Sequence, residues 1–229
     1  MPTYQESGLK KIIDICTVIL LILTAGAAFW GIKVGKDALS EYKKMNMVAM
    51  STAILNMDKE IFKKLSDKPY LQAMFVEIPN EITSHQVINL FLEKESQKFE
   101  DWKDIPSLYD KLWGFNEFDN KDNSDKSRLR EAYFIGEEVL YVVLNAHEAH
   151  RQLLISDGDW ESWAAYIDDL GTNPLFLAAI YCGHKYGYIS KEFAEILKQR
   201  LMKKDDISRV IKSIYPEMIN SDWVDRIGR

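Results

Sequence analysis

The chain has 229 residues, of which 47% are hydrophobic and 12% aromatic, and its formal net charge is −6 at pH 7. Such an acidic chain lacks the clustered basic face that binds phosphate backbones, so we expect no nucleic-acid partner. Its only two cysteines, Cys16 and Cys182, exclude a disulfide-rich scaffold and are typical of a reducing compartment.

The segment from Ile12 to Ile32, IIDICTVILLILTAGAAFWGI, is mostly apolar and nearly uncharged. A helix of this length rises about 1.5 Å per residue and so matches the roughly 30 Å hydrocarbon core of a bilayer. We therefore predict a short N-terminal tail over residues 1–11 and a transmembrane helix over residues 12–32, with the lipid bilayer as a partner.

A cleaved secretory signal is the alternative for this segment, with Ala25-Gly26-Ala27 as its cleavage site. The apolar run continues past that site to Ile32, and Asp14 would lie inside the short apolar core of a signal. Both observations favour a retained anchor. Asp14 lies at the edge of the span, where solvation by the headgroup region is the favoured explanation for a carboxylate, ahead of an intramembrane function.

Basic residues near the span predict its orientation. Lys10 and Lys11 precede it, and more lysines follow it closely. The basic excess favours a single-pass protein of the cell (inner) membrane, with the N-terminus outside and the C-terminal domain in the cytoplasm. The lysines that follow the span are Lys33, Lys36, Lys43 and Lys44.

Residues 33–67 are predicted to continue the membrane helix as a stalk. Neither proline nor glycine occurs from Lys36 to Asp67, and Pro69 ends the segment. Apolar residues recur at helical spacings of three and four, as on a face that pairs with another copy or packs onto the domain. They form two series: Val34, Ala38, Tyr42, Met45 and Ala49, and Met47, Met50, Ile54, Met57 and Ile61.

Small residues recur every four positions at the end of the span, at Ala27, Gly31 and Gly35. This spacing allows close approach of two helix backbones in lipid, so we expect a homo-oligomer associating through this face. The alternative is that glycine and alanine are simply common in membrane helices.

Residues 68–229 are predicted to form a soluble helical domain, because no alternating strand or hairpin signal occurs there. Asp159 is the expected N-cap of one helix, and Ser190 of another. The fold class is therefore all-α: a transmembrane helix, a stalk helix and a multi-helix bundle. The expected segments of the domain are 70–78, 84–99, 104–113, 127–155, 160–170, 175–186, 191–203 and 206–215, with 116–126 as an exposed loop.

A tryptophan-rich helix followed by an Asn-Pro turn stands out in this domain, at Trp160-Glu-Ser-Trp163, Tyr166 and Asn173-Pro174, with Phe176, Tyr188 and Phe193 beyond it. In these features the chain resembles uncharacterised bacterial single-pass membrane proteins with a small all-helical cytosolic domain. The resemblance implies the layout of the chain and a bacterial origin. It implies no activity, since none is established for that group.

His147 and His150 are the residues best suited to hold a metal, since side chains three apart on a helix lie on neighbouring positions. A third ligand would come from Glu138 or from His184. The spacing differs from that of H-E-x-x-H. The favoured interpretation is therefore that His147 packs in the bundle while Glu148, His150 and Arg151 form a solvated face, without a metal.

Other polar groups give no catalytic assignment. Cys182 and His184 diverge on a helix, so they cannot make a nucleophile–base contact. The pairs Glu137-Glu138 and Asp168-Asp169 are ordinary for helix surfaces. We assign no catalytic residue and expect no cofactor.

Trp160, Trp163 and Tyr166 lie one turn apart and could bind a partner, since tryptophan and tyrosine concentrate binding energy where exposed. The alternative, which we favour, is that they belong to the core.

The sequence favours a non-enzymatic, membrane-tethered interaction or regulatory protein that presents a cytosolic surface to an unidentified protein partner. One alternative is a membrane-bound metal-dependent enzyme that uses His147, His150 and Glu138. The other is a membrane-perturbing effector that uses Asp14.

Overall fold

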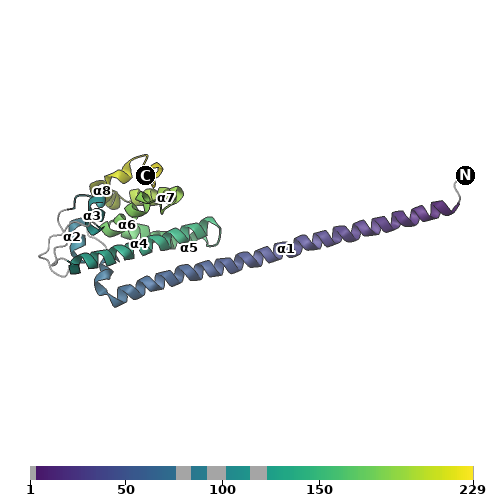
Figure 1. The fold of residues 1–229 in the computed structure, drawn as a ribbon, viewed down its shortest axis with the longest axis horizontal. Coiled ribbons are helices and arrows are strands. Elements are labelled where there is room, and N and C mark those ends of the chain that lie inside the picture. Colours follow the sequence, from purple (N-terminus) through teal and green to yellow (C-terminus); the bar gives the residue numbers. More distant parts are fainter. Residues whose placement is uncertain (1–3, 76–83, 92–101, 114–122, 229) are drawn as a thin grey trace. The chain divides into compact units, whose positions relative to one another are not determined.

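The computed structural model describes residues 4–75, 84–91, 102–113 and 123–228, without the side chains of residues 4–23, 25–29, 85 and 123–125. All regular elements in these ranges are helical, which confirms the all-α class (Figure 1).

Helix α1 runs without a break from Tyr4 to Asp67, as a helix continuing into a stalk requires. Among the residues that the structure describes, no helix is both long and apolar enough to cross a membrane. Most side chains of the expected span, residues 12–32, lie outside the described residues, and so do those of Asp14 and Ala27.

The chain divides into two compact units, Met1–Ala49 and Met50–Arg229, and the boundary falls inside α1. The second unit thus begins earlier than the expected residue 68. The reason is that Ile54, Ile61 and Leu65 are buried in the core. Of the two apolar series, the one containing Ile54 and Ile61 therefore serves the core of the domain.

The second unit consists of the end of α1, the long helix α4 and several shorter helices packed around a buried central one. Helix α6 is the centre, since every residue from Pro174 to Ile180 is buried, and α4 packs against both α6 and α5 (Figure 1). The elements that follow α1 are η1 (Pro69–Phe75), α2 (Ser84–Asn89), α3 (Ile105–Trp113), α4 (Asn123–Arg151), α5 (Asp157–Leu170), α6 (Pro174–Lys185), α7 (Lys191–Lys203), α8 (Asp205–Ile214), η2 (Pro216–Ile219) and η3 (Val224–Arg226).

Side-chain caps fix where the central helices begin. Asn173 caps α6 with Pro174 in its first turn, and Ser190 caps α7 as expected. The expected cap of α5 was wrong by three residues. Ser156 is the N-cap, and Asp159 occupies the third helical position of a capping box, where its carboxylate accepts from the Ser156 backbone N–H.

Other boundaries also differ from the expected ones, and helix α4 ends at Arg151 rather than at residue 155. Helix α2 ends at Asn89, and residues 92–99 of the expected segment lie outside the described residues. Helix α4 begins at Asn123, so the end of the expected loop 116–126 is helical.

Candidate functional site

An open cleft of about 340 Å³ lies between the last turn of α1, η1 and the exposed side of α4. Leu71 and Ile135, both nearly fully buried, line it with apolar surface, and the ring of Phe134 adds a wall. Its volume falls in the range of small-molecule and side-chain sites. The charged residues that line it are Lys64, Asp67, Lys68, Glu131 and Glu138.

Two ion pairs lie at the rim of this cleft. They connect α4 to the last turn of α1 and to Lys68, the residue that follows α1. Lys64 pairs with Glu138, and the Lys68 ammonium lies 2.7 Å from the Glu131 carboxylate. The Tyr70 hydroxyl also donates to Glu131. The hydrogen bond from Lys68 lowers the pKa of Glu131, whereas burial, with help from Glu131, raises the pKa of Tyr70 to about 12. The carboxylate therefore stays charged and the phenol neutral at physiological pH.

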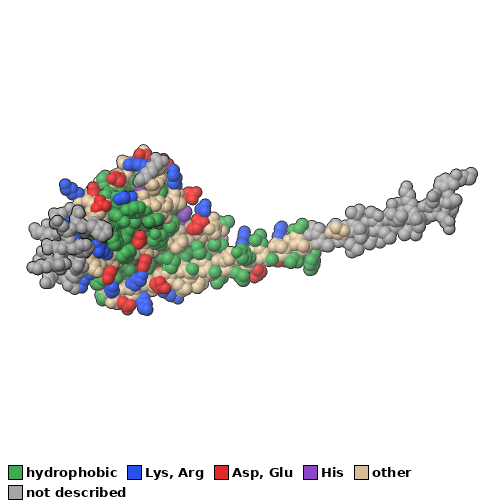
Figure 2. Space-filling model, in the orientation of Figure 1, with side chains coloured by type: hydrophobic (Ala, Val, Ile, Leu, Met, Phe, Trp, Pro, Cys, Tyr) green, Lys and Arg blue, Asp and Glu red, His purple; other side chains and the backbone are tan. Residues whose placement is uncertain are grey.

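Beside the cleft, aromatic side chains of α3, α4, α6 and the residues that follow α6 form a cluster around Tyr109, which we call the aromatic surface. The Tyr109 ring centroid lies 5.6 Å from that of Tyr181, 6.0 Å from Tyr133, and 6.4 Å from both Trp113 and Tyr186. Figure 2 shows hydrophobic side chains gathered where these helices lie in Figure 1. The aromatic surface comprises Tyr109, Trp113, Tyr133, Phe134, Tyr181, Tyr186 and Tyr188.

Phe134 joins the two features, because it lines the cleft and its ring lies 5.5 Å from Trp113 and 5.7 Å from Tyr133. Its exposed fraction is 46%, and those of Tyr186 and Tyr188 are 49% and 57%. The cleft and the aromatic surface therefore form one continuous face of the domain.

Two cations lie over the rings of this face. The Lys185 ammonium is 5.3 Å from the centroid of Tyr181 and 5.6 Å from that of Tyr186, and the Arg130 guanidinium is 5.2 Å from that of Trp113. A hydrogen bond with Tyr181 raises the pKa of Lys185. The face therefore offers positive charge next to aromatic rings.

Below the rings lies a small polar centre. The Cys182 sulfur is 3.5 Å from the Tyr109 hydroxyl, and burial raises the pKa values of Tyr109 and Tyr133. Burial also raises the pKa of the Glu137 carboxyl, although a hydrogen bond from Tyr133 opposes this. No arrangement of nucleophile and base is formed by these described groups.

Cys182 and His184 serve different parts of the core, as their divergence on a helix implies. The His184 ring stacks on Trp223 with centroids 4.4 Å apart, and its Nε2 lies 2.6 Å from the Trp223 carbonyl oxygen. Burial lowers the pKa of His184. This histidine therefore fixes the C-terminal segment onto α6.

The structure does not bring Glu138 to the two histidines of α4. Glu138 pairs with Lys64, whereas His147 lies between Trp160 and Phe193, each with its ring centroid 5.4 Å away. His150 also stacks on Trp160, with the ring centroids 5.9 Å apart, and its Nε2 is 2.8 Å from the Asp157 carboxylate. Among the described residues, no group of three His, Cys, Asp or Glu side chains is placed to hold a metal.

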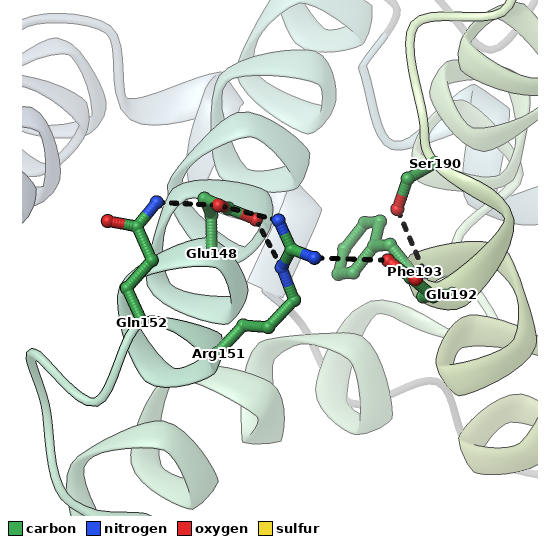
Figure 3. A network of polar contacts seen from close by, with 6 residues as sticks. All are labelled: Glu148, Arg151, Gln152, Ser190, Glu192 and Phe193. Atoms are coloured by element: carbon green, nitrogen blue, oxygen red, sulfur yellow. Dashed lines mark hydrogen bonds and ion pairs between the residues drawn. The ribbon is translucent and has the colours of Figure 1, made fainter.

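The expected solvated face at the end of α4 is a network that reaches α7 (Figure 3). Arg151 donates two hydrogen bonds to Glu148, at 2.9 and 3.0 Å, and Gln152 donates a third at 2.6 Å. Figure 3 shows the Arg151 guanidinium also directed toward Glu192, 3.9 Å away. These groups connect the end of α4 to the beginning of α7.

The tryptophan helix α5 packs inward along most of its length. Trp160 is buried, and Trp163 is partly buried against the core. The Tyr166 hydroxyl donates to Asp58 at 3.0 Å, so α5 contacts the domain part of α1. Of the carboxylate pair that follows, Asp168 accepts from Arg200 at 2.9 Å.

Gly31 and Gly35 lie in an open part of α1, where an added Cβ atom would meet nothing within 4 Å. Their substitution therefore leaves the described structure of a single chain unchanged. This makes them clean positions for testing association between copies.

Sequence reasoning missed both the cleft and the aromatic surface. Lys64 and Glu138 are 74 residues apart, so no local pattern indicates that they pair. Tyr186 and Tyr188 do follow a helix end, where an exposed aromatic pair is a usable local signal.

Comparison with protein-family models, with curated proteins and with solved structures finds no match for this chain.

Proposed function

We propose that this protein is a membrane-tethered interaction protein whose helical domain presents a binding surface to a protein partner. Residues 12–32 anchor it in the inner membrane as a single span. The N-terminus lies outside and the domain lies in the cytoplasm. The apolar run and the lysines that follow it support the anchor and its orientation.

The face made of the cleft and the aromatic surface is the binding surface in this proposal. The observation that carries it is the exposure of Phe134 at an open cleft and of Tyr186 and Tyr188 on the aromatic surface. Contiguous exposed apolar patches are uncommon on monomeric domains and often mark interaction sites. Tyrosine, tryptophan and arginine are the residues that dominate binding energy at interfaces.

The mechanism is positional and needs no chemical step. An anchored domain meets partners at the membrane at a higher effective concentration than a free domain does. Self-association through Ala27, Gly31 and Gly35 would bring several copies of the binding surface into one assembly. Because the association face lies on α1 and the binding face on the domain, the two roles use different residues.

Paired variants of the full-length protein in its own membranes test the binding face. We expect proteins that co-purify with the wild type to be lost from the Phe134→Ser, Tyr186→Ser double variant. Leu153→Ser is the matched control, because Leu153 is also exposed but lies outside the face. An identical set of co-purifying proteins from all three chains would contradict the proposal.

A further inference from the structure

Two cations that lie over the aromatic surface have no carboxylate partner among the residues that the structure describes. They are Arg130 on α4 and Lys185 at the end of α6. The cations at the rim of the cleft differ from them, since Lys64 and Lys68 each pair with a glutamate. Acidic residues outnumber basic ones in this chain by 35 to 29, so a shortage of carboxylates does not explain the difference.

Three rings lie around the ammonium group of Lys185. The Lys185 Nζ is 5.3 Å from the ring centroid of Tyr181, 5.6 Å from that of Tyr186 and 5.9 Å from that of Tyr109. A hydrogen bond with Tyr181 raises the pKa of Lys185, so the side chain is charged at neutral pH. The rings attract the cation without neutralising it, and a side chain that is already held loses little freedom when it pairs with an anion.

Arg130 is also held in place by its neighbours. Its Nε donates to the Leu112 carbonyl oxygen at 2.7 Å, and its guanidinium carbon lies 5.2 Å from the ring centroid of Trp113. These contacts orient the guanidinium, whose terminal nitrogens make no hydrogen bond to the described residues. A carboxylate can bind a guanidinium oriented in this way through two parallel hydrogen bonds.

Each of the two cations has an exposed aromatic ring beside it. Phe134 follows Arg130 by four residues, so the two side chains are neighbours on one side of α4, and Phe134 is exposed. Tyr186 is also exposed and adjoins Lys185. The same combination of positive charge and exposed ring therefore occurs twice on this surface.

The two sites adjoin each other, because the ring centroids of Tyr109 and Trp113 are 6.4 Å apart. We propose that the aromatic surface binds an acidic segment of the protein partner, in which carboxylates flank an apolar side chain. The carboxylates pair with Arg130 and Lys185, and the apolar side chain covers the exposed rings. This inference rests on the proposed function, since it states the chemistry of the partner that the binding face receives. Complementary charge across such an interface orients the partner and speeds its association.

A single-stranded nucleic acid is the competing ligand, since it also binds to cations combined with aromatic rings. Carboxylates near the two cations disfavour it. Glu131 directly follows Arg130 on α4, and the charge of Asp110 adds to the raised pKa of Lys185. Within a Debye length of about 8 Å these carboxylates repel a chain of phosphates, whereas a single carboxylate at each cation meets less repulsion.

Binding of defined peptides to the full-length protein in mild detergent tests the proposal. The probes are the dye-labelled, end-capped peptide Gly-Glu-Phe-Glu-Gly and its versions with Gln or Lys in place of Glu, measured by fluorescence anisotropy. We expect the Glu peptide to bind about tenfold more tightly than the Gln peptide, since each exposed ion pair contributes about threefold. The Lys peptide should bind most weakly. Equal binding of the Glu and Gln peptides, or no binding of any of the three, would overturn the proposal.

A matched pair of variants locates the charge that the peptide recognises. Lys185→Met removes the charge and keeps an unbranched side chain against the rings. Lys59→Met is the control, because Lys59 is exposed on the side of α1 opposite the buried Ile54 and Ile61. We expect Lys185→Met alone to bind the Glu peptide about threefold more weakly, with binding of the Gln peptide unchanged. The same loss in both variants would show a general effect of net charge and would contradict the proposal.

Reversal of the charge predicts a gain of binding, which unfolding of a variant cannot imitate. Lys185→Glu should bind the Lys peptide more tightly than the wild type does, and the Glu peptide more weakly. Absence of that gain, in a variant that unfolds at the wild-type temperature, would refute the pairing with Lys185.

Two further comparisons separate the possible failures. Tighter binding of a labelled oligothymidylate than of the Glu peptide, lost in Lys185→Met, would assign the surface to nucleic acid and overturn the acidic segment. A Gln peptide that binds as tightly as the Glu peptide, and is lost from the Phe134→Ser, Tyr186→Ser double variant, refutes the charge pairing and leaves the proposed binding face intact. Peptides that bind equally to this double variant and to the wild type would refute the face itself.

Discussion

At the scale of single residues, burial sets the ionisation of His147 between two aromatic rings. Its pKa lies below 6.5, mainly because burial disfavours the charged ring. At pH values between that lowered pKa and 6.5, His147 is protonated in the unfolded chain but neutral in the folded chain. The free energy of unfolding should therefore fall as the pH drops from 6.5 through the folded-state pKa.

His147→Phe tests this dependence, because it keeps a ring beside Trp160 and Phe193 that cannot be protonated. We expect the variant to lose less stability than wild type between pH 7.5 and pH 5.5 in urea unfolding. His184, whose pKa is also lowered by burial, is present in both proteins and gives both the same additional slope. Parallel losses in the two proteins would refute the assignment to His147.

The hydrogen bond from Tyr166 to Asp58 is a second residue-scale contact with a measurable value. Burial and this bond raise the pKa of Tyr166 to about 12, so the phenol remains a donor at neutral pH. Tyr166→Phe should lower the free energy of unfolding by about 1–2 kcal/mol. In an Asp58→Asn background, Tyr166→Phe should lower the free energy of unfolding by clearly less, as measured by urea unfolding of all four proteins. An equal loss in both backgrounds would exclude a coupling between Tyr166 and Asp58.

At the scale of elements, α5 has a glycine near each end, and the two have different surroundings. A Cβ atom on Gly171 would lie 2.6 Å from Leu201 Cδ2 and 3.0 Å from Ile207 Cγ2, whereas one on Gly158 would meet nothing closer than 3.8 Å. Gly171 therefore permits α7 and α8 to pack closely against the end of α5.

Alanine at each position should consequently shift stability in opposite directions. We expect Gly171→Ala to destabilise the protein by about 1–3 kcal/mol through overpacking. Gly158→Ala should stabilise it by about 0.4–1 kcal/mol by restricting the unfolded chain. Thermal unfolding of the two variants gives the comparison, and destabilisation of equal size in both would contradict it.

Local patterns predicted most elements but not how distant elements meet. Asn173-Pro174 and Ser190 gave the beginnings of α6 and α7, because caps and proline act within a few residues. Ser156 was missed because Asp159 is also a good capping residue, and only the backbone geometry shows which of the two is the cap. The cleft was out of reach, since it depends on pairs such as Lys64 with Glu138.

The end of the predicted stalk is a second case in which a local pattern did not show what a helix face contacts. Ile54 and Ile61 have the spacing of an apolar helix face, which is the same for a face buried in a domain and for one that pairs with another copy. The structure places these two residues in the core of the domain. Periodicity alone could not choose between the two uses.

At the scale of the whole molecule, the division at Met50 predicts which fragment folds. Residues 50–229 should unfold cooperatively, because they retain Ile54, Ile61 and Leu65 in the core. Residues 68–229 lose these three side chains, each worth about 1.5–3 kcal/mol when fully buried. Urea unfolding followed by circular dichroism should show the longer fragment to be more stable by several kcal/mol, and equal midpoints would contradict the division.

Membrane attachment is the claim on which the tethered role depends, and a carbonate wash of membranes from cells making the full chain tests it most directly. The account predicts that the chain of residues 1–229 stays with the sedimented membranes at high pH, while a chain of residues 50–229 is released. Release of the full chain into the supernatant would contradict the anchor and, with it, the proposed function.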